Sequence, residues 1–432
     1  HRRDLYEAIE AGGYPEWDFG IQDIDPEWAA RQPYDVLDPT KLVPEEECPV
    51  QLIGTMTLNR NPDNHFAENE QVAFCPSNVP PGIDFSDDPL LQGRLFSYLD
   101  TQKSRLGTAN FHQLPINAPR CPMHNFQRDG MMQMQLPKGR ANYEPNSLDK
   151  AGEVGGPRAD ARGGFRTVQT ATDLGNDPSE GKLRIRAETF ADHYSQPRMF
   201  LRSLSQPEQN HVGAAITFEL SKVTLPHVRE AVLAQLRNVD EDLAATVARG
   251  LGVDLPAAAP TDRPAVDLPP SDKLSILKQG VPAPKGRKLG ILVGDGADAA
   301  VVKSLKAEAE AAGATVMVVC QKVGGAKLSD GSVQEADGQL AGTPSLVFDA
   351  VVITTGKEGF DKLIDDPAAL EFAGMAWSHL KALGLCPGGR KILAKANGGE
   401  DAFTLDHADA KGVVAKLADR AWDREPALRP KP

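Results

Sequence analysis

The spacing of apolar residues divides the chain into parts with different secondary structure. Residues 17–24 and 51–58 alternate apolar and polar positions, as strands do when one face of a sheet is buried. Apolar residues recur with helical spacing in 226–236 and 241–251, and Asp240 is placed to cap the second of these helices. From residue 288 onward, continuous apolar runs alternate with helical segments, which is typical of a parallel sheet with helices on its faces. The runs are 288–293, 315–319 and 348–353, and the helical segments include 299–312 and 367–383.

Two stretches lack such periodicity. Residues 76–195 contain many Pro, Gly and Asn, and loops of that length are uncommon unless they are functional or lie across a neighbour. Residues 254–287 are rich in Pro and Ala, which indicates an extended, semi-rigid linker. We therefore expect four parts: an α+β portion over 1–195, a helical region over 196–253, the linker over 254–287, and an α/β domain of flavodoxin-like type over 288–425.

One strong helix interrupts the loop-rich stretch. Asp87 or Asp88 can accept hydrogen bonds from the free amides of a first turn, and Pro89 suits the first helical position. Gly107 can adopt the left-handed conformation that ends a helix. At about 3.6 residues per turn, one face of this helix carries Leu91, Arg94, Tyr98, Gln102 and Arg105.

A phenol with guanidinium groups before and after it on one helix face suggests an anionic oxygen. A phenol has a pKa of about 10, so a phenolate at neutral pH needs a cation or a metal beside it. Arg94 is placed to donate to the Tyr98 oxygen, and Arg105 can reach an anion on the same face. A ferric haem would supply the metal and, through its propionates, the anion. A tyrosine on an amphipathic helix more often only packs, with its hydroxyl at the rim, so the residues alone leave both interpretations open.

A longer pattern resolves this choice. The sequence Arg94-Leu-Phe-Ser-Tyr98-Leu-Asp-Thr101, followed by Arg105-Leu-Gly107, resembles the proximal haem signature of the haem catalases. Further segments resemble catalase segments in the same order along the chain: 58–64, 68–74, 81–85 and 125–130. The resemblance covers most of the chain. Because large-subunit catalases carry a C-terminal α/β domain and small-subunit catalases lack it, the chain resembles the large-subunit type.

The resemblance implies an enzyme that disproportionates hydrogen peroxide to water and dioxygen at a haem. It assigns the axial iron ligand to Tyr98, the tuning of its charge to Arg94, and a haem propionate contact to Arg105. Leu91 belongs to the same haem-binding set, and Gln102 stands where small-subunit enzymes have a His. Haem b and an oxidised d-type haem both stay open. The catalase fold further implies a partial antiparallel barrel before residue 76 and, after it, a segment that wraps between subunits of a homotetramer.

Cleavage of peroxide also needs an acid–base group on the opposite face of the haem. Catalases use a His and an Asn there, from a segment that would precede residue 1. None of the nine His, including His65, His112 and His124, has that sequence context. The chain also starts without Met, next to a helical pattern at 4–11. We therefore expect a fragment or processed chain that holds only the proximal half of the site.

Cys75 departs from the family pattern. It precedes Tyr98 by 23 residues. At this position some of the large-subunit catalases that the chain resembles carry a His bonded to the β-carbon of the axial Tyr. One hypothesis is a thioether between Cys75 and Tyr98, formed by peroxide oxidation. The other is a buried free Cys that packs as a small apolar residue.

Composition argues against several kinds of partner. The net charge of −13 and the absence of a Lys/Arg run argue against a nucleic-acid partner. No apolar run approaches the roughly 20 residues that span a bilayer. Five widely spaced Cys without a CxxC pair fit a reducing compartment, and hence the cytoplasm. NADPH is not expected, because Arg3 matches the nucleotide pocket of small-subunit catalases but Gly13 replaces an Asn there.

The C-terminal domain offers two weaker signals. Gly294-Asp295-Gly296 could bind phosphate but is more often a plain strand-to-helix turn. The domain resembles class I glutamine amidotransferases and intracellular proteases, and Cys386 lies near their nucleophile position, but Pro387 follows it and no His is adjacent. We expect a structural or chaperone-like role there. The alternative to a working catalase is an inert remnant whose α/β domain acts as a chaperone or interaction module.

Overall fold

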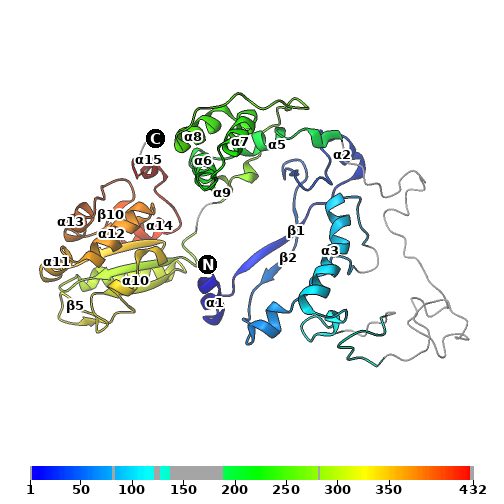
Figure 1. The fold of residues 1–432 in the computed structure, drawn as a ribbon. Coiled ribbons are helices and arrows are strands. Elements are labelled where there is room, and N and C mark those ends of the chain that lie inside the picture. The colour runs from blue at the N-terminus through cyan, green and yellow to red at the C-terminus, as the bar shows by residue number, and fades with distance from the viewer. Residues whose placement is uncertain (1, 80–82, 121–126, 137–187, 281–282, 429–432) are drawn as a thin grey trace, which may run out of the picture. The chain divides into compact units, whose positions relative to one another are not determined.

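The computed structural model describes residues 2–79, 83–120, 127–136, 188–280 and 283–428. They form two compact units, one made of the residues up to 201 together with 260–273, the other of 202–259 together with the residues from 274 onward. Figure 1 labels the helices and strands of both units. Among the described residues, no helix is long and apolar enough to cross a membrane. Cys121, His124 and parts of the catalase-like segments 81–85 and 125–130 lie outside the described residues.

In the first unit, two strands pair and leave both faces of their sheet exposed. β1 (Glu16–Ile21) runs antiparallel to β2 (Gln51–Thr57), which confirms the strands predicted at 17–24 and 51–58 with somewhat shorter bounds. Four apolar side chains of this pair are 46% to 66% exposed, namely Trp17, Phe19, Leu52 and Ile53. An isolated pair of strands is only marginally stable. The pair therefore fits a partial barrel whose apolar faces need further cover.

The other elements of this unit are helical. The longest is α3 (Pro89–Leu106), with 18 residues. Another, α1 (Arg2–Glu10), confirms the helix expected at 4–11. The remaining ones are α2 (Pro26–Ala30), the π-helical turn η1 (Phe66–Glu70), the short 3-10 helices η2 (Phe111–Gln113) and η3 (Glu188–Ala191), and α5 (Ser195–Ser203).

The second unit begins with three helices, α6 (Gln206–Ser221), α7 (Pro226–Val239) and α8 (Glu241–Leu251). The last two are those predicted from apolar spacing, and Asp240 caps α8 as expected by accepting the Leu243 N–H at 2.8 Å. Glu208, in the first turn of α6, accepts the N–H and hydroxyl of Ser205, both at 2.8 Å, and the Ser275 hydroxyl at 2.6 Å. Burial alone would raise the pKa of Glu208, but these hydrogen bonds lower it to about 2.

The linker residues that the structure describes are held at several points. Arg237 donates to the Pro256 carbonyl at 2.6 Å, and Asn238 donates to the Ala259 carbonyl at 2.9 Å, so α7 fixes the first part of the linker. Most of 254–280 has no regular structure, as its Pro and Ala content predicts. Two short helices follow within the expected linker, η4 (Asp272–Leu274) and α9 (Ile276–Gln279).

A six-stranded parallel sheet forms the centre of the α/β domain. The strand order is β10-β9-β8-β3-β4-β7. The strands are β3 (Lys288–Val293), β4 (Thr315–Cys320), β7 (Gly338–Gln339), β8 (Ala350–Thr354), β9 (Ala382–Leu385) and β10 (Thr404–Asp406). Smaller elements complete the domain: the hairpin of β5 (Ala326–Lys327) and β6 (Val333–Gln334), then η5 (Leu340–Gly342), η6 (Ser345–Val347), η7 (Trp422–Arg424) and α15 (Glu425–Leu428).

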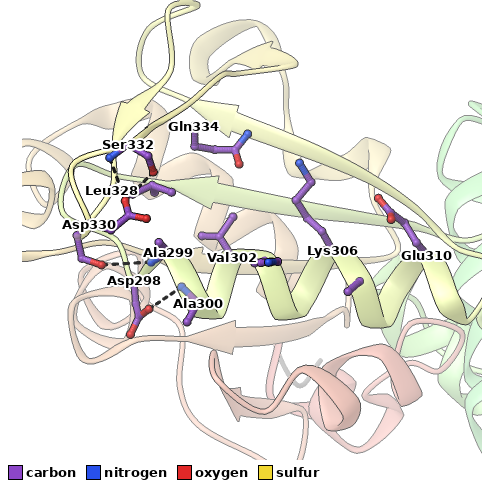
Figure 2. Close-up of a pocket in the computed structure, with 13 residues that line it drawn as sticks. Asp298, Ala299, Ala300, Val302, Lys306, Glu310, Leu328, Asp330, Ser332 and Gln334 are labelled. Carbon is purple, nitrogen blue, oxygen red and sulfur yellow. Dashed lines mark hydrogen bonds between the residues drawn. The ribbon is translucent and has the colours of Figure 1, made fainter.

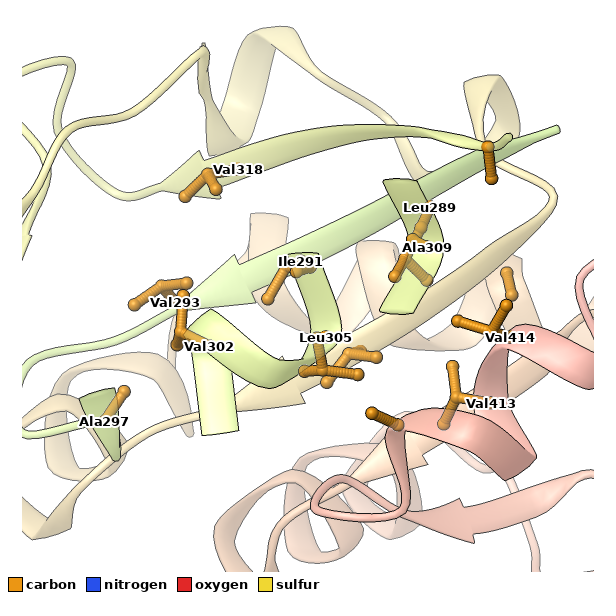
Figure 3. Packing of buried hydrophobic residues seen from close by; sticks show 14 of the residues in the cluster. Leu289, Ile291, Val293, Ala297, Val302, Leu305, Ala309, Val318, Val413 and Val414 are labelled. Atoms are coloured by element: carbon orange, nitrogen blue, oxygen red, sulfur yellow. The ribbon is translucent and has the colours of Figure 1, made fainter. Parts of the chain in front are cut away.

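Alternate residues of the central strand β3 pack in different layers. Leu289, Ile291 and Val293 pack with α10 (Ala299–Ala311) and α14 (Ala410–Ala415), as Figure 3 shows. Leu292 belongs to the other layer, with α11 (Lys357–Leu363), α12 (Pro367–Ser378) and α13 (Pro387–Lys395). Successive side chains of a strand point to opposite faces. A continuous apolar run is therefore what a sheet covered on both faces requires.

One predicted helix is shorter than its apolar pattern suggests. The helix expected over 367–383 ends at Ser378, as α12. Leu380 then adopts a positive φ of 60°, and the residues from Ala382 to Leu385 form β9, all of them buried. A short apolar run fits a buried helix end and a buried strand equally well. Pairing of β9 with β8 and β10 decides between them.

Candidate functional site

The helix predicted around Tyr98 is confirmed as α3. Asp88 precedes it and accepts the Leu90 N–H at 2.8 Å, and Pro89 occupies its first position. Gly107 ends it with φ of 73°, a left-handed conformation that glycine adopts without strain. The helix starts and ends where its capping residues predict, so the face that carries Tyr98 is the predicted one.

Arg94 reaches the phenol oxygen of Tyr98 directly. Its Nη2 donates to that oxygen at 3.2 Å, and its guanidinium carbon lies 5.0 Å from the ring centroid. Residues four apart on a helix share a face, which brings the two side chains together. Both are half-buried. A guanidinium donor stabilises negative charge on the oxygen that accepts from it, which is what a phenolate ligand requires.

The loop before α3 packs on Tyr98. The Phe74 ring meets the Tyr98 ring edge-on, with centroids 5.9 Å apart and an angle of 75° between the planes. The next residue, Cys75, is 8% exposed, and burial raises the pKa of its thiol. The Asn117 side chain fixes the backbone just before them, since it accepts the Ala73 N–H at 2.8 Å and donates to two main-chain carbonyls at 2.9 and 3.0 Å. The buried thiol thus lies in a segment held against α3.

Gln102 and Arg105 bind the same loop from the last turns of α3. Arg105 donates to the carbonyls of Glu70 and Val72, both at 2.5 Å, and to the side-chain oxygen of Gln102. Gln102 is 6% exposed, and its amide donates to the Phe74 carbonyl at 3.4 Å. Arg105 therefore joins α3 to the end of η1 and to the loop that follows it, a role that the sequence did not indicate. Its contact with a propionate stays a prediction, as does the contribution of Leu91, which is half-buried on the same helix.

Two residues of this arrangement were not among the predicted site residues. Phe74 lies in the catalase-like segment 68–74, so the resemblance pointed to its neighbourhood without giving it a role. Asn117 stands in a loop-rich stretch in which asparagines are frequent, and nothing in its local sequence marks it. Only its three hydrogen bonds to the main chain show that it shapes the site.

The histidines provide no competing metal site in the described part of the chain. His65 faces the Glu70 carboxylate at 3.5 Å, and His112 packs edge-on against the ring of the preceding residue. Among the described residues, no group of three or more His, Cys, Asp or Glu could hold a metal ion. The role of Tyr98 as a metal ligand stays a prediction.

The glycine turn after β3 is closed by protein atoms. The Asp295 carboxylate accepts from the Lys362 ammonium at 2.8 Å and from the Lys327 N–H at 3.0 Å. The hydrogen bond from Lys362 is the main cause that holds the pKa of Asp295 below its usual value. A Cβ added at Gly356 would lie 2.5 Å from the Gly296 carbonyl oxygen, so the neighbouring loop already occupies the space over the turn. These contacts support the interpretation as a structural turn.

Cys386 caps a helix at the end of β9. Its sulfur accepts the Gly389 N–H at 3.2 Å, and the residue is 2% exposed. Its φ of −69° and ψ of 169° are ordinary extended values, unlike the strained turn of a nucleophile elbow. The nearby histidine, His407, pairs with the Thr354 hydroxyl at 3.0 Å. The contacts of Cys386 therefore support the expected structural role.

A pocket of about 780 Å³ lies beside α10, between that helix and residues 328–334. Figure 2 shows its lining, which contains none of the predicted site residues. The charged groups there have both signs, with Lys303 and Lys306 beside Asp330 and Glu310. None of its described lining residues has a buried side-chain polar atom without a partner. The pocket therefore gives no specific indication of a ligand.

Comparison with known proteins assigns most of the chain to one group of family models. The model "Catalase" matches residues 1–150, "Catalase-related immune-responsive" matches 187–251, and "C-terminal domain found in long catalases" matches 285–423. The first match includes all of α3, and the last includes the parallel sheet.

Curated relatives extend over nearly the whole chain. It is 47% identical to Catalase C of Rhizobium meliloti over 99% of its length and 60% of that protein. It is 44% identical to Catalase HPII of Pseudomonas putida, over 100% of the chain and 60% of that protein, and 40% identical to Catalase-2 of Bacillus subtilis, over 98% and 61%. The chain thus spans about 60% of the length of these relatives.

Proposed function

The chain belongs to the catalase family, to its large-subunit type, and from this premise we propose that it is part of a haem enzyme that disproportionates hydrogen peroxide to water and dioxygen. The observation that carries the proposal is the hydrogen bond from Arg94 to the phenol oxygen of Tyr98, on the helix with the proximal signature. The alternative, an inert remnant with a chaperone-like domain, is not favoured, because the similarity covers the whole chain.

The residues around Tyr98 fit a haem. The porphyrin supplies four of the iron ligands, so the protein needs to provide an axial ligand and not a cluster of side chains. A phenol oxygen beside a guanidinium is such a ligand. Large apolar side chains of the same region are 43% to 62% exposed and available to cover a flat apolar ring, namely Val72, Phe74, Phe96 and Leu99. Haem b and an oxidised d-type both satisfy these requirements.

The residues of the chain set the properties of the ligand oxygen. A bound haem supplies the redox chemistry, in which one peroxide is reduced to water and a second is oxidised to dioxygen. Arg94 donates to the Tyr98 oxygen and withdraws part of its negative charge, which limits the electron density that this oxygen gives to a metal. Gln102 and Arg105 keep the loop of Phe74 on α3 and so fix the orientation of the Tyr98 ring. We assign the propionate contact to Arg105 and a packing contact with the ring to Leu91.

The acid–base half of the site lies, in this proposal, in another part of the protein. Cleavage of the O–O bond needs a group that takes a proton from one peroxide oxygen and gives it to the other. In the described part of the chain, His65 and His112 have other contacts and no catalase-like distal sequence context. The relatives are longer than the matched region, and we propose that the His and Asn expected upstream of residue 1 supply this group.

We further propose a thioether between the Cys75 sulfur and the Tyr98 β-carbon. The supporting observations are that Cys75 is buried and that the residue before it packs on the Tyr98 ring. The step removes one hydrogen from the thiol and one from the β-carbon while hydrogen peroxide is reduced to two waters. A free, packed Cys is the alternative. A protease digest after denaturation distinguishes them: a cross-linked peptide pair two hydrogens lighter than the sum supports the bond, and two separate peptides of unmodified mass exclude it.

The remaining assignments follow from the family. We propose a homotetramer in the cytoplasm, with hydrogen peroxide as substrate and without NADPH, nucleic acid or membrane as partners. We also propose the flavodoxin-like class for the C-terminal domain. Numbered along the chain, all six strands have the order 3-2-1-4-5-6. Without the two-residue edge strand β7, the remaining five have the order 2-1-3-4-5 of flavodoxin-like sheets, and this agreement supports the proposed class.

The test compares Tyr98→Phe with a matched control in the full-length enzyme. Removing the phenol oxygen should abolish the haem Soret band and oxygen evolution from peroxide, while the folded α/β domain is retained. Tyr14→Phe removes a hydroxyl from an exposed tyrosine and should change neither signal. A Tyr98→Phe enzyme with an unchanged haem spectrum and undiminished oxygen evolution would refute the assignment of the ligand.

A further inference from the structure

A small cavity in the first unit is lined by two hydroxyl side chains without hydrogen-bond partners. Its volume is about 10 Å³, and Tyr34 and Thr189 are among its lining residues. The hydroxyl oxygens of both are shielded from solvent, and neither has a partner among the described residues. Tyr34 as a whole is only 7% exposed. Leaving a buried hydroxyl unpaired costs free energy, so two in one cavity indicate a missing partner.

The cavity lies where three distant segments of the chain meet. Lys41 donates to the Asp192 carbonyl at 3.1 Å, which joins the first segment to the second. The Val266 N–H donates to the Ser195 hydroxyl at 2.7 Å, which joins the third segment to the second. All four of these residues line the cavity. The segments are 33–42, 188–196 and 260–268.

We infer that this cavity binds one water molecule, held by hydrogen bonds to the Tyr34 and Thr189 hydroxyls. A volume of about 10 Å³ is close to the least that holds one water and excludes anything larger. Burial raises the pKa of Tyr34 to about 12, so its hydroxyl stays protonated and can donate. A hydroxyl of Thr189 both donates and accepts, and a buried water needs two to four such partners.

A metal cation does not fit the same cavity. Calcium requires six to eight oxygen ligands and magnesium an octahedral set, whereas the one carboxylate among the lining residues, that of Asp192, already accepts the N–H groups of Tyr194 and Ser195. The Lys41 ammonium also lines the cavity, and its positive charge repels a second cation. The water therefore completes a junction of three chain segments that otherwise rests on direct hydrogen bonds, and it pairs two hydroxyls that are too buried to reach solvent.

A crystal structure of the full chain tests the inference. It should show one ordered water within about 2.6–3.2 Å of both the Tyr34 and Thr189 oxygens. No density in the cavity, at a resolution that reveals other buried waters, would overturn the inference. So would a direct hydrogen bond between the two hydroxyls.

A mutational cycle tests the shared water independently. Tyr34→Phe and Thr189→Val each remove one partner, and each should lower the Tm by on the order of 2 °C. If one water serves both hydroxyls, the double variant should lose about as much as one single variant, whereas Thr189→Ser should behave like the unmodified protein. Fully additive shifts would show that the two hydroxyls act separately and would refute the shared site.

Discussion

Arg424 is a buried residue near the end of the α/β domain, and its side chain makes several polar contacts there. We expect its replacement to destabilise that part of the domain. Its side chain is 1% exposed and binds both oxygens of the Asp401 carboxylate, at 2.7 and 3.0 Å. It also donates to the carbonyls of Trp377 and Lys381, both at 3.0 Å, and its guanidinium carbon lies 3.8 Å from the Trp377 ring centroid. The residue thus joins η7 to the end of α12, the start of β9 and the loop before β10.

Replacing Arg424 by Met should destabilise this part of the domain by about 3 kcal/mol. Removing one partner of a buried ion pair costs roughly 3–5 kcal/mol, because the other charge is left without its partner. The Asp401 side chain is 29% exposed, so water can solvate part of its charge and the lower end applies. The two carbonyls lose their donors, which adds to the cost, while the Met side chain retains part of the apolar contact with Trp377.

Hydrogen exchange measured by mass spectrometry is the appropriate assay, because a chain with two compact units need not unfold in one step. About 3 kcal/mol corresponds to a roughly 100-fold faster exchange of amides that open with this region. Peptides that contain residues 377–382, 401–406 and 420–428 should show this faster exchange. Arg390→Met is the matched control, since Arg390 pairs with Glu400 at 2.8 Å on the surface and should contribute at most about 1 kcal/mol.

The pH dependence provides a second check. Burial alone would raise the pKa of Asp401, but the hydrogen bonds from Arg424 hold it below its usual value. Because the folded pKa is depressed, the pair stabilises the domain above the unfolded pKa of about 4, and this contribution is lost as pH falls through the folded value. The difference between Arg424→Met and the unmodified protein should shrink at acid pH. Exchange no faster than in Arg390→Met, or a difference independent of pH, would contradict the reasoning.

Three further predictions concern other parts of the chain. In the haem-reconstituted full-length enzyme, Arg94→Met should shift the Soret maximum while Arg94→Lys shifts it less, and identical spectra would exclude tuning of the ligand. Glu208→Gln should remove the part of the acid denaturation that occurs as pH falls from about 4.5 towards 2, since the folded pKa of this carboxyl is lowered to about 2; an unchanged acid transition would refute it. Gly290→Val should lower stability by roughly 1–3 kcal/mol, because a Cβ there lies 2.4 Å from the Phe348 ring, and thermal unfolding should show partial recovery with Phe348→Leu.

Much of the local structure could be predicted from the sequence. The bounds of α3 follow from Asp88, Pro89 and Gly107, and those of β3 follow from a run of apolar residues. These features depend on residues a few positions apart, and so does the contact of Arg94 with Tyr98, one helical turn away. The catalase resemblance, carried by long motifs around the same residues, is confirmed by the family models and the relatives.

Contacts between distant segments could not be predicted in this way. The sequence alone determined where helices and strands can start and end, which residues share a face, and to which family the chain belongs. Tertiary structure alone decided that Arg105 binds the carbonyls of Glu70 and Val72, that Asn117 fixes the loop of Cys75, and that β9 replaces the end of a predicted helix. The physical reason is that capping and periodicity act within a few residues, whereas the partner of a buried polar group depends on which distant segments pack around it.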